Sequence, residues 1–335
     1  MHILVYEYLT GGGHPEVLSL SMTQEGEKMV MALVSDLLAL PGITLTLLRD
    51  HQLPDFALSN ERLKIRETHP SATGLEHLEG SLASVDAVWP IAPESDNCLE
   101  RICRLIERSG KRLLSTSSEG VALMGKKRET LNVLKNAAIP VVSTVLLQDL
   151  SGWQRMPFPL VFKRNDGAGC EDTIIIQNPS EKDAFMEMPG HHDWIVQPLI
   201  QGDVLSLSGI FHQGQGRLLS CNRQHVHQTD HGFHLCGITI GALDNEPAFK
   251  DLLSGIAAAL PTLWGFAGVD LVYDVDGPKV LEVNPRLTSA YPGILTATGW
   301  NPAALVLDLA QNGLLPPMLD PLTSNPTELR WSNFP

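Results

Sequence analysis

Residues 268–286 read GVDLVYDVDGPKVLEVNPR, and this stretch says more about the fold than any other in the chain. Two runs of β-forming residues, Val269 to Tyr273 and Lys279 to Val283, flank the connection Val275-Asp276-Gly277. Strand-like runs separated by a short connection containing Asp and Gly are typical of a β-hairpin. The sequence therefore predicts two antiparallel strands here.

The loop length of this hairpin determines which side chains face each other. A two-residue Asp-Gly turn would place Asp270 opposite Val283, whereas a three-residue loop with Gly277 in the left-handed conformation pairs Asp270 with Glu282. Pro278 donates no ladder hydrogen bond, so it fits the edge of a bulged turn. We predict the three-residue loop, because it is the one that brings the acidic residues together.

The hairpin also collects oxygen-bearing side chains on one face. Asn284 lies on the same face as Glu282, because side chains of a strand alternate with a period of two. Buried carboxylates need protons, hydrogen bonds or cations, and hard oxygen donors suit Mg²⁺ held together with substrate phosphates. The alternative is a hairpin with two solvated acids. The surrounding Val and Leu residues favour a buried metal site formed by Asp270, Glu282 and Asn284.

The composition restricts the class of protein. With 335 residues, 43% hydrophobic and 19% charged, the chain can bury a sizeable core in two or three subdomains. A net charge of −14 disfavours nucleic acid or an acidic membrane as partner. The five cysteines form no CxxC pair, which favours a reducing compartment. Without a basic leader or an apolar run of about 18 residues, we expect a cytoplasmic protein that does not span a membrane.

The order of predicted elements divides the chain into four parts. Residues 1–115 alternate strand and helix patterns, which indicates βα units around a mostly parallel sheet. Residues 116–200 begin with one helix, predicted over 119–138, and continue with shorter strands. Residues 201–315 contain longer strands, a helix and the hairpin, as in an antiparallel sheet backed by helices. Residues 316–335 are rich in proline, and we expect an extended tail.

Three positively charged residues are candidates for binding phosphate. Lys163 ends an apolar strand and enters a loop with Gly167 and Gly169, whose backbone N–H groups can approach phosphate closely. The loop has neither the GxxxxGK[ST] pattern nor a Rossmann fingerprint, and a surface hairpin loop is the alternative. Arg223 and Arg286 are candidates for holding phosphate and stabilising charge that develops during its transfer. The alternative for both is an ordinary surface ion pair.

The stretch Trp194 to Ile200 reads as a strand that runs into a short connector. A connector between two lobes can offer backbone N–H and C=O groups to a purine edge, with apolar walls from Leu199 and Ile200. The alternative is an ordinary turn at Gly202-Asp203.

In order and spacing, these pieces resemble the ATP-grasp superfamily over roughly residues 110–310. They are Lys126 in Gly125-Lys-Lys-Arg128, Lys163, the Gln197 to Ile200 connector, Asp203, Arg223, Asp270 and Glu282-Val-Asn284-Pro-Arg286. Within that superfamily the chain is similar to the tyramine/L-glutamate ligase group of methanofuran biosynthesis. This similarity lies in Tyr6-Glu-Tyr-Leu-Thr-Gly-Gly-Gly13, Ala92-Pro-Glu-Ser95, Asn222-Arg-Gln224 and Asn284-Pro-Arg-Leu-Thr-Ser289.

The resemblance implies an ATP-grasp fold of the α/β and α+β classes, with an N-terminal parallel αβ domain and two α+β lobes that enclose ATP. It implies Lys126 and Lys163 on the phosphates, and Mg²⁺, or Mn²⁺ in its place, on the hairpin oxygens. Arg286 and Arg223 would lie nearest the transferred phosphoryl group. The adenine would lie against Gln197, Pro198, Leu199 and Ile200. Members often have a Glu for the ribose just after the connector glycine, and Asp203 is the candidate at that position.

The resemblance also implies a reaction. Such enzymes phosphorylate a carboxylate to an acyl phosphate, which an amine attacks to give an amide, ADP and phosphate. We expect a ligase that joins the glutamate γ-carboxylate to an aromatic amine, tyramine or tyrosine. The alternatives are an ATP-grasp ligase for another amino acid or peptide, and a nucleotide-binding regulatory module without turnover. The expected partners are small carboxylate and amine substrates, and a homodimer is left open.

Overall fold

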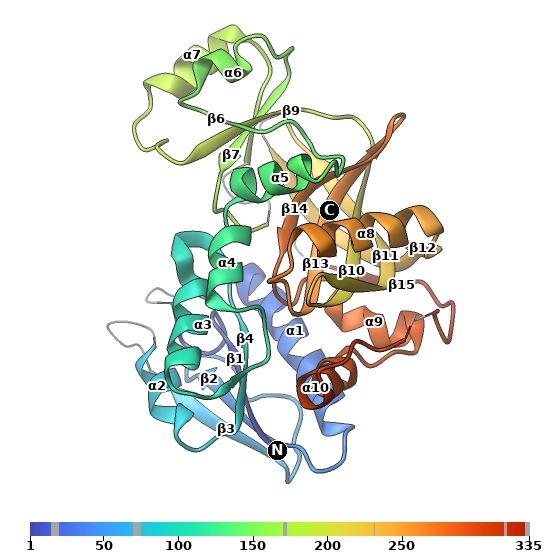
Figure 1. Cartoon of the computed structure of the whole chain (residues 1–335). Coiled ribbons are helices and arrows are strands. Elements are labelled where there is room, and N and C mark those ends of the chain that lie inside the picture. The colour runs from blue at the N-terminus through green and yellow to red at the C-terminus, as the bar shows by residue number, and fades with distance from the viewer. Residues whose placement is uncertain (15–19, 70–74, 170–172, 231, 318–319, 332–335) are drawn as a thin grey trace.

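The computed structural model describes residues 1–14, 20–69, 75–169, 173–230, 232–317 and 320–331. They form three parts, each built on its own β-sheet (Figure 1). The predicted α/β and α+β fold, with a parallel N-terminal part and two further lobes, is confirmed. Among the described residues, none of the helices combines the length and the apolar character needed to cross a bilayer.

The N-terminal part contains a five-stranded sheet in the order β3-β2-β1-β4-β5, in which all neighbours are parallel. Residues 3–6 of the central strand β1 are fully buried, because helices cover both faces of the sheet. Ile3 and Val5 pack on the side of α1, and Leu4 and Tyr6 on the side of α2 and α3. The bounds are β1 (His2–Glu7), α1 (Leu20–Leu38), β2 (Thr44–Asp50), β3 (Leu63–Thr68), α2 (Glu76–Leu82), β4 (Ala87–Ile91), the 3₁₀ helix η1 (Ser95–Asn97), α3 (Cys98–Arg108) and β5 (Arg112–Leu113).

The single helix predicted over residues 119–138 is two helices, α4 (Ser118–Met124) and α5 (Lys127–Asn136). Between them Lys126 has an extended backbone, with φ −115° and ψ 103°. Asn165, in a loop far along the chain, stabilises the break: its carbonyl accepts from Lys127 N at 2.9 Å, and its side-chain oxygen accepts from Arg128 N at 2.9 Å. The capping residue lies nearly forty residues after the helix that it caps, so the local sequence pattern around residues 119–138 could not predict the break.

The central lobe has a four-stranded sheet in the order β6-β9-β7-β8. Its small core centres on the aromatic residues Trp153, Phe162 and Phe185, and Phe162 contacts each of the other two edge to face. The bounds are β6 (Val145–Leu146), α6 (Leu150–Trp153), β7 (Leu160–Arg164), β8 (Thr173–Ile176), α7 (Pro179–Glu187) and β9 (Trp194–Pro198).

The C-terminal lobe has a six-stranded antiparallel sheet in the order β14-β13-β10-β11-β12-β15. One face packs against α5 and α8, which bury the odd-numbered residues Leu205, Leu207, Val269 and Leu271. The predicted proline-rich tail contributes the edge strand β15, which pairs with β12. The bounds are β10 (Asp203–His212), β11 (Gln215–Gln228), β12 (Phe233–Leu243), α8 (Pro247–Ala259), β13 (Gly265–Asp274), β14 (Gly277–Asn284), α9 (Tyr291–Thr298), α10 (Pro302–Asn312) and β15 (Thr327–Arg330).

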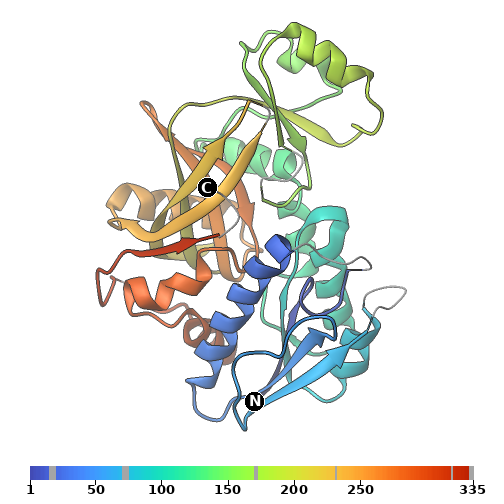
Figure 2. The ribbon, with the colours of Figure 1, turned by 180° about the vertical axis from the view of Figure 1, so that it is seen from behind.

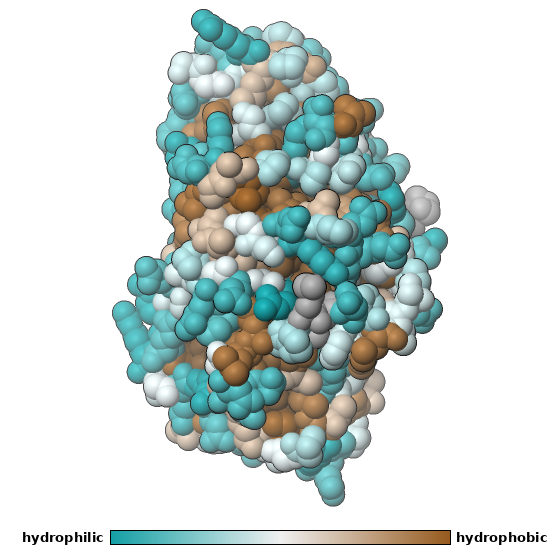
Figure 3. Space-filling view, turned by 45° about the vertical axis from the view of Figure 1, so that its right-hand side comes forward, coloured by the Kyte–Doolittle hydropathy of each residue, from teal (hydrophilic) through white to brown (hydrophobic). Residues whose placement is uncertain are grey.

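The N-terminal part and the C-terminal lobe share one hydrophobic core. Leu33 and Leu37 of α1 pack in the same cluster as Ile294 of α9 and Val306 of α10. Figure 2 shows α1 running between the N-terminal sheet and these two helices. On the face seen in Figure 3, hydrophilic side chains cover most of the surface, and apolar ones appear mainly in recesses. The shared core therefore fixes the position of the C-terminal lobe relative to the N-terminal part.

Candidate active site

A cavity of about 900 Å³ lies where the three parts of the molecule meet. It is lined by the carboxyl ends of the parallel strands β1 and β4, the loop after β7, the segment after β9 and one face of the C-terminal sheet. Carboxyl ends of parallel strands are the usual ligand-binding edge of such sheets, and ligand sites favour domain interfaces. The cavity is therefore the candidate active site.

The hairpin of β13 and β14 pairs Asp270 with Glu282, as predicted, but by a different route. The predicted three-residue loop is wrong: the turn is Val275-Asp276, closed by the pair Asp274 and Gly277. The ladder then shifts by one residue between Asp270 and Leu271, where Leu281 of β14 forms a bulge. The bulge brings the acids opposite each other without a longer loop.

Asp270 is held by two amide groups, one on the adjacent strand β14 and one on β11, two strands away. Asn284 Nδ2 donates to one carboxylate oxygen at 2.9 Å, and Gln224 Nε2 of β11 donates to the other at 2.7 Å. These hydrogen bonds leave the amide oxygens of Asn284 and Gln224 available as further acceptors. Gln224 was not predicted as a site residue.

Glu282 is held by Lys127, which also reaches the loop of the central lobe. Lys127 Nζ lies 3.0 Å from Glu282 Oε2 and donates to the carbonyl of Gly167. Both charged side chains are largely buried, with exposed fractions of 8% and 13%. Lys127 is therefore linked to the site through Glu282, whereas Lys126, predicted for this position, is exposed at the start of α5; neither lysine lines the cavity itself.

The two adjacent carboxylates differ in their electrostatics. Burial and the nearby negative charge of Glu282 raise the pKa of Asp270. Burial acts in the same direction on Glu282, but the positive charges of Lys127 and Lys163 outweigh it and lower its pKa. Two buried carboxylates side by side favour a bound cation, and three oxygen donors from carboxylate and amide groups suit Mg²⁺. Asp270, Glu282 and Asn284 therefore fit the predicted metal site.

Arg223 does not reach the cavity, contrary to the prediction. It alternates with Asn222 and Gln224 along β11, and those two face Ser206 and Asp270. Arg223 is paired with Leu205 on the opposite face, and its guanidinium lies 2.6 Å from Asp203. Asp203, predicted to contact the cofactor, is thus an exposed ion-pair partner that does not line the cavity.

Arg286 lines the cavity and is held by a carboxylate of the N-terminal part. Its Nε and Nη2 atoms lie 2.9 to 3.1 Å from the two oxygens of Glu94. Both side chains are nearly buried, at 13% and 6% exposed. A bidentate pair of this kind fixes the guanidinium plane. Glu94 was not predicted as a site residue on its own, although it lies in the stretch Ala92-Pro-Glu-Ser95.

The connector after β9 lines the apolar end of the cavity. Pro198, Leu199 and Ile200 line it together with Val142 and Val161. Gln197 is buried, and its amide donates to Thr144 at 2.8 Å. At the phosphate end, the predicted residues Lys163, Gly167 and Gly169 all line the cavity. The cavity thus has an apolar end and a charged end, as an adenine nucleotide requires.

The N-terminal wall of the cavity carries a different set of charges. Glu7 is buried and accepts from Thr10 N at 2.6 Å and Leu9 N at 3.2 Å, while burial raises its pKa. Glu25 of α1, whose carboxylate accepts from Ser289, lines the same wall, as does Arg101 of α3. Acidic and basic groups therefore stand together across from the hairpin.

The glycines at 11–13 explain how this wall is shaped. Gly12 has φ +76°, and a Cβ there would lie 2.4 Å from Thr68 Oγ1. A Cβ at Gly13 would lie 2.3 Å from the ring of Tyr8. The loop can therefore adopt this conformation only with glycine at positions 12 and 13. In this conformation Tyr8 and His14 line the cavity.

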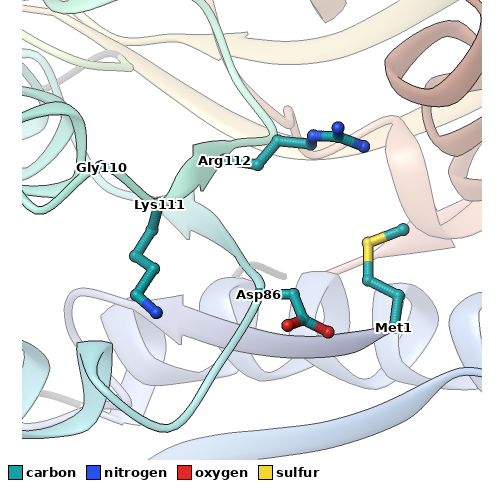
Figure 4. A pocket seen from close by; sticks show the side chains of 5 residues that line it. All are labelled: Met1, Asp86, Gly110, Lys111 and Arg112. Carbon is teal, nitrogen blue, oxygen red and sulfur yellow. The ribbon is translucent and has the colours of Figure 1, made fainter.

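A second hollow of about 540 Å³ lies at the opposite edge of the N-terminal sheet (Figure 4). It is lined by Met1, Asp86, Gly110, Lys111 and Arg112, where strands β1, β4 and β5 begin. Lys111 and Arg112 point apart in Figure 4 and do not converge on one point. We therefore assign no function to this hollow.

Comparisons with known proteins agree with this geometry. The family model described as ATP-grasp domain matches residues 124–290, and that described as pre ATP-grasp 3 domain matches residues 43–121. The tyramine–L-glutamate ligase of Methanocaldococcus jannaschii is 25% identical over 295 residues, which are 88% of this chain and 85% of that protein. The corresponding ligase of Methanocaldococcus fervens is 24% identical over 88% of this chain and 89% of its own length.

Solved structures show the same fold. An ATP-grasp superfamily protein from Archaeoglobus fulgidus superimposes with a TM-score of 0.69 and 22% identity, over 98% of this chain and 92% of its own. An L-amino acid ligase from Bacillus licheniformis gives a TM-score of 0.64 and 17% identity, over 96% and 74%. The two family matches together span well over half of the chain, and the hairpin oxygens, buried lysine and connector converge on one cavity. The chain therefore belongs to the ATP-grasp family.

Proposed function

We propose that this protein joins the γ-carboxylate of L-glutamate to an aromatic amine, tyramine or tyrosine, with ATP as the energy source, as in methanofuran-type cofactor biosynthesis. The observation that carries the proposal is the cavity itself. Its lining includes Asp270, Glu282, Asn284 and Lys163 as well as an apolar connector and a wall of mixed charge, and Lys127 contacts Glu282. This combination supports the proposal.

The nucleotide would bind with its adenine at the apolar end of the cavity and its phosphates at the charged end. The adenine lies against the connector of Pro198 to Ile200, and Lys163 and the backbone of Gly167 and Gly169 hold the phosphates. Asp270, Glu282 and Asn284 would hold a Mg²⁺ ion, or Mn²⁺ in its place, which would supply positive charge to offset that of the phosphates. Lys127 keeps Glu282 ionised and holds its carboxylate beside Asp270, where the metal ion would bind.

The chemistry needs a carboxylate to approach ATP, and like charges oppose that approach. A carboxylate oxygen attacks the γ-phosphorus, the bond to ADP breaks, and an acyl phosphate forms. The amine nitrogen then attacks the acyl carbon, a proton leaves the nitrogen, and phosphate departs with the carboxylate oxygen. Lys163 and Arg286 line this part of the cavity and offset the negative charge during the first step.

The N-terminal wall supports an amino acid as one substrate. Arg101 supplies positive charge for a second carboxylate, and Glu7 and Glu25 supply negative charge for an ammonium group. The choice of glutamate and of an aromatic amine rests on the similarity to two tyramine–L-glutamate ligases over 88% of the chain. The four stretches on which the predicted resemblance to this group depends, 6–13, 92–95, 222–224 and 284–289, all contribute residues to the cavity.

A substrate panel tests the proposal. The protein is incubated with Mg-ATP, L-glutamate and a series of amines, and ADP and the product mass are measured. We expect ADP together with the γ-glutamyl amide of tyramine or tyrosine. Glu282→Gln should abolish turnover, whereas Asp274→Asn at the turn of the same hairpin should not. Mg-ATP binding without ADP formation across carboxylates and amines would instead indicate a regulatory module, and an amide of another amino acid would replace the substrate assignment.

A further inference from the structure

A group of polar contacts joins the N-terminal part to the loop after β7, and it is separate from the metal site. Asp96 of η1 accepts from Arg164 Nη2 at 2.8 Å. The backbone N–H of Asp96 donates to Asp166 Oδ2 at 3.0 Å. Arg164 also contacts both oxygens of Asp166, at 3.0 and 3.1 Å. We call these three residues, Asp96, Arg164 and Asp166, the latch.

The position of the latch connects two parts of the site. On the central lobe, Arg164 directly follows Lys163, and Asp166 directly precedes Gly167. On the N-terminal part, Asp96 is two residues from Glu94, which holds Arg286 of the C-terminal lobe. The short segment 94–96 therefore contacts two other parts of the molecule. Asp96 contacts Arg164 and Asp166 of the central lobe, and Glu94 contacts Arg286 of the C-terminal lobe.

The backbone at Asp96 is shaped for this contact. Asp96 has φ 53° and Asn97 has φ 56°, in the left-handed region that residues other than glycine seldom adopt. Aspartate and asparagine tolerate this region best, and such conformations persist where the surroundings determine them. Here the conformation directs the N–H of Asp96 to Asp166 at 3.0 Å.

The loop is anchored on its other sides as well. Asn165 is buried, and its amide donates to Glu129 at 3.0 Å, while its backbone N–H donates to Asp193 at 2.8 Å. Lys127 donates to the carbonyl of Gly167. The latch is thus the contact that relates residues 164–167 to the N-terminal wall, whereas these other contacts relate them to α5 and to the central lobe itself.

Stability alone does not explain the latch. The side chain of Asp96 is 78% exposed and that of Arg164 is 32% exposed, and ion pairs with such exposure contribute little to folding. The same contact has more effect on the position of the central lobe relative to the N-terminal part, because each of the two has a hydrophobic core of its own.

We propose that Asp96 is a positioning residue that holds residues 164–167, which follow β7, against the N-terminal wall. This proposal rests on the proposed function. When the latch is formed, it holds Lys163 and Gly167 in a fixed position relative to the segment that carries Glu94, and in the proposal this limits the access of water to the cavity. When it is broken, the nucleotide binds more weakly and water competes with the amine for the acyl phosphate, which yields carboxylate and phosphate instead of amide.

Asp96→Asn tests the proposal. Asparagine keeps the shape and the left-handed backbone but removes the charge that Arg164 contacts. The matched control is Asp320→Asn, because Lys250 and Asp320 form an ion pair of 3.0 Å with exposed fractions of 28% and 78%, away from the cavity. We expect both variants to unfold at the same temperature as the wild type.

The first readout is the Kd of a non-hydrolysable ATP analogue with Mg²⁺, which requires no knowledge of the substrates. Asp96→Asn should raise this Kd about fivefold at low salt, and the difference from wild type should shrink towards 1 M KCl, where surface charges are screened. Asp320→Asn should leave the Kd unchanged. The second readout is the amount of ADP released per amide formed, which should rise in Asp96→Asn alone.

Equal values for Asp96→Asn and Asp320→Asn in both readouts would overturn the proposal, as would a Kd difference that persists unchanged at high salt. Failure of the proposed function is distinguishable, because it would appear as absence of amide with the wild-type protein. The change in Kd of the ATP analogue would remain measurable in that case.

Discussion

Lys127 illustrates how much of the site depends on single side chains. Its ammonium group contacts the carboxylate of Glu282 on the C-terminal sheet and the carbonyl of Gly167 on the central lobe. It also lowers the pKa of Glu282 against the effect of burial. Removing one partner of a buried pair leaves the other charge without compensation, which is a large effect.

Lys127→Ala should reduce Mg-ATP turnover at least about a hundredfold, as expected for loss of a positive charge that orients a phosphate-binding site. Lys126→Ala is the matched control, since it removes the same side chain from the adjacent, exposed position. Its turnover should lie within about threefold of wild type. Comparable losses in the two variants, measured by ADP release, would contradict the assignment of Lys127.

Two site residues could be predicted from the sequence only to within one position. We predicted Lys126 and Arg223, whereas the side chains that contact the hairpin acids are those of the adjacent residues Lys127 and Gln224. Which lysine faces inward depends on the helix break that Asn165 stabilises from afar. Which of Arg223 and Gln224 faces inward depends on the face of β11 that α8 covers, and side chains alternate along a strand. Neither cause is local in sequence.

At the scale of elements, the hairpin shows a correct pairing reached through an incorrect loop. The alternation of apolar residues and the chemistry of the acids were enough to predict that Asp270 and Glu282 face each other. The bulge at Leu281 was not predictable, because a bulge adds one residue and so compensates for a shorter turn. Similarly, β15 was missed because it pairs as an edge strand within a proline-rich segment.

The contact between α1 and α9 makes a prediction about stability and pH. Tyr291 of α9 donates to the carboxylate of Asp36 in α1 at 2.9 Å, and Asp36 is 6% exposed. Burial raises the pKa of Asp36 from 3.8 to about 6, although the hydrogen bond from Tyr291 acts in the opposite direction. The folded protein therefore retains this proton to a higher pH than the unfolded chain does.

Because the folded state binds more protons between about pH 4 and about pH 6, the contribution of Asp36 to the free energy of unfolding falls as pH rises through that window. Asp36→Asn removes this dependence while keeping an acceptor for Tyr291. Relative to wild type, its free energy of unfolding in urea should increase by about 2 kcal/mol between pH 4 and pH 7.5. If the free energies of unfolding of the two proteins change in parallel with pH, the pKa of Asp36 is not raised by folding and the prediction is wrong.

At the scale of the whole molecule, the site exists only because three sheets meet. The fold class and the order of the lobes followed from the sequence, since alternating βα units and long antiparallel strands have distinct patterns. The pairing of Glu94 with Arg286 did not, because it joins residues 192 positions apart. Contacts of this kind depend on how lobes pack, and the shared core around α1 determines that packing here.

The most direct test of the account follows an oxygen atom through the reaction. Glutamate labelled with ¹⁸O in its γ-carboxylate is incubated with the protein, Mg-ATP and the amine that gives product, and the released phosphate and nucleotide are analysed by mass spectrometry. The account predicts that one ¹⁸O atom appears in the inorganic phosphate and none in ADP, because the carboxylate oxygen attacks the γ-phosphorus. Label in AMP, or phosphate without label, would contradict it.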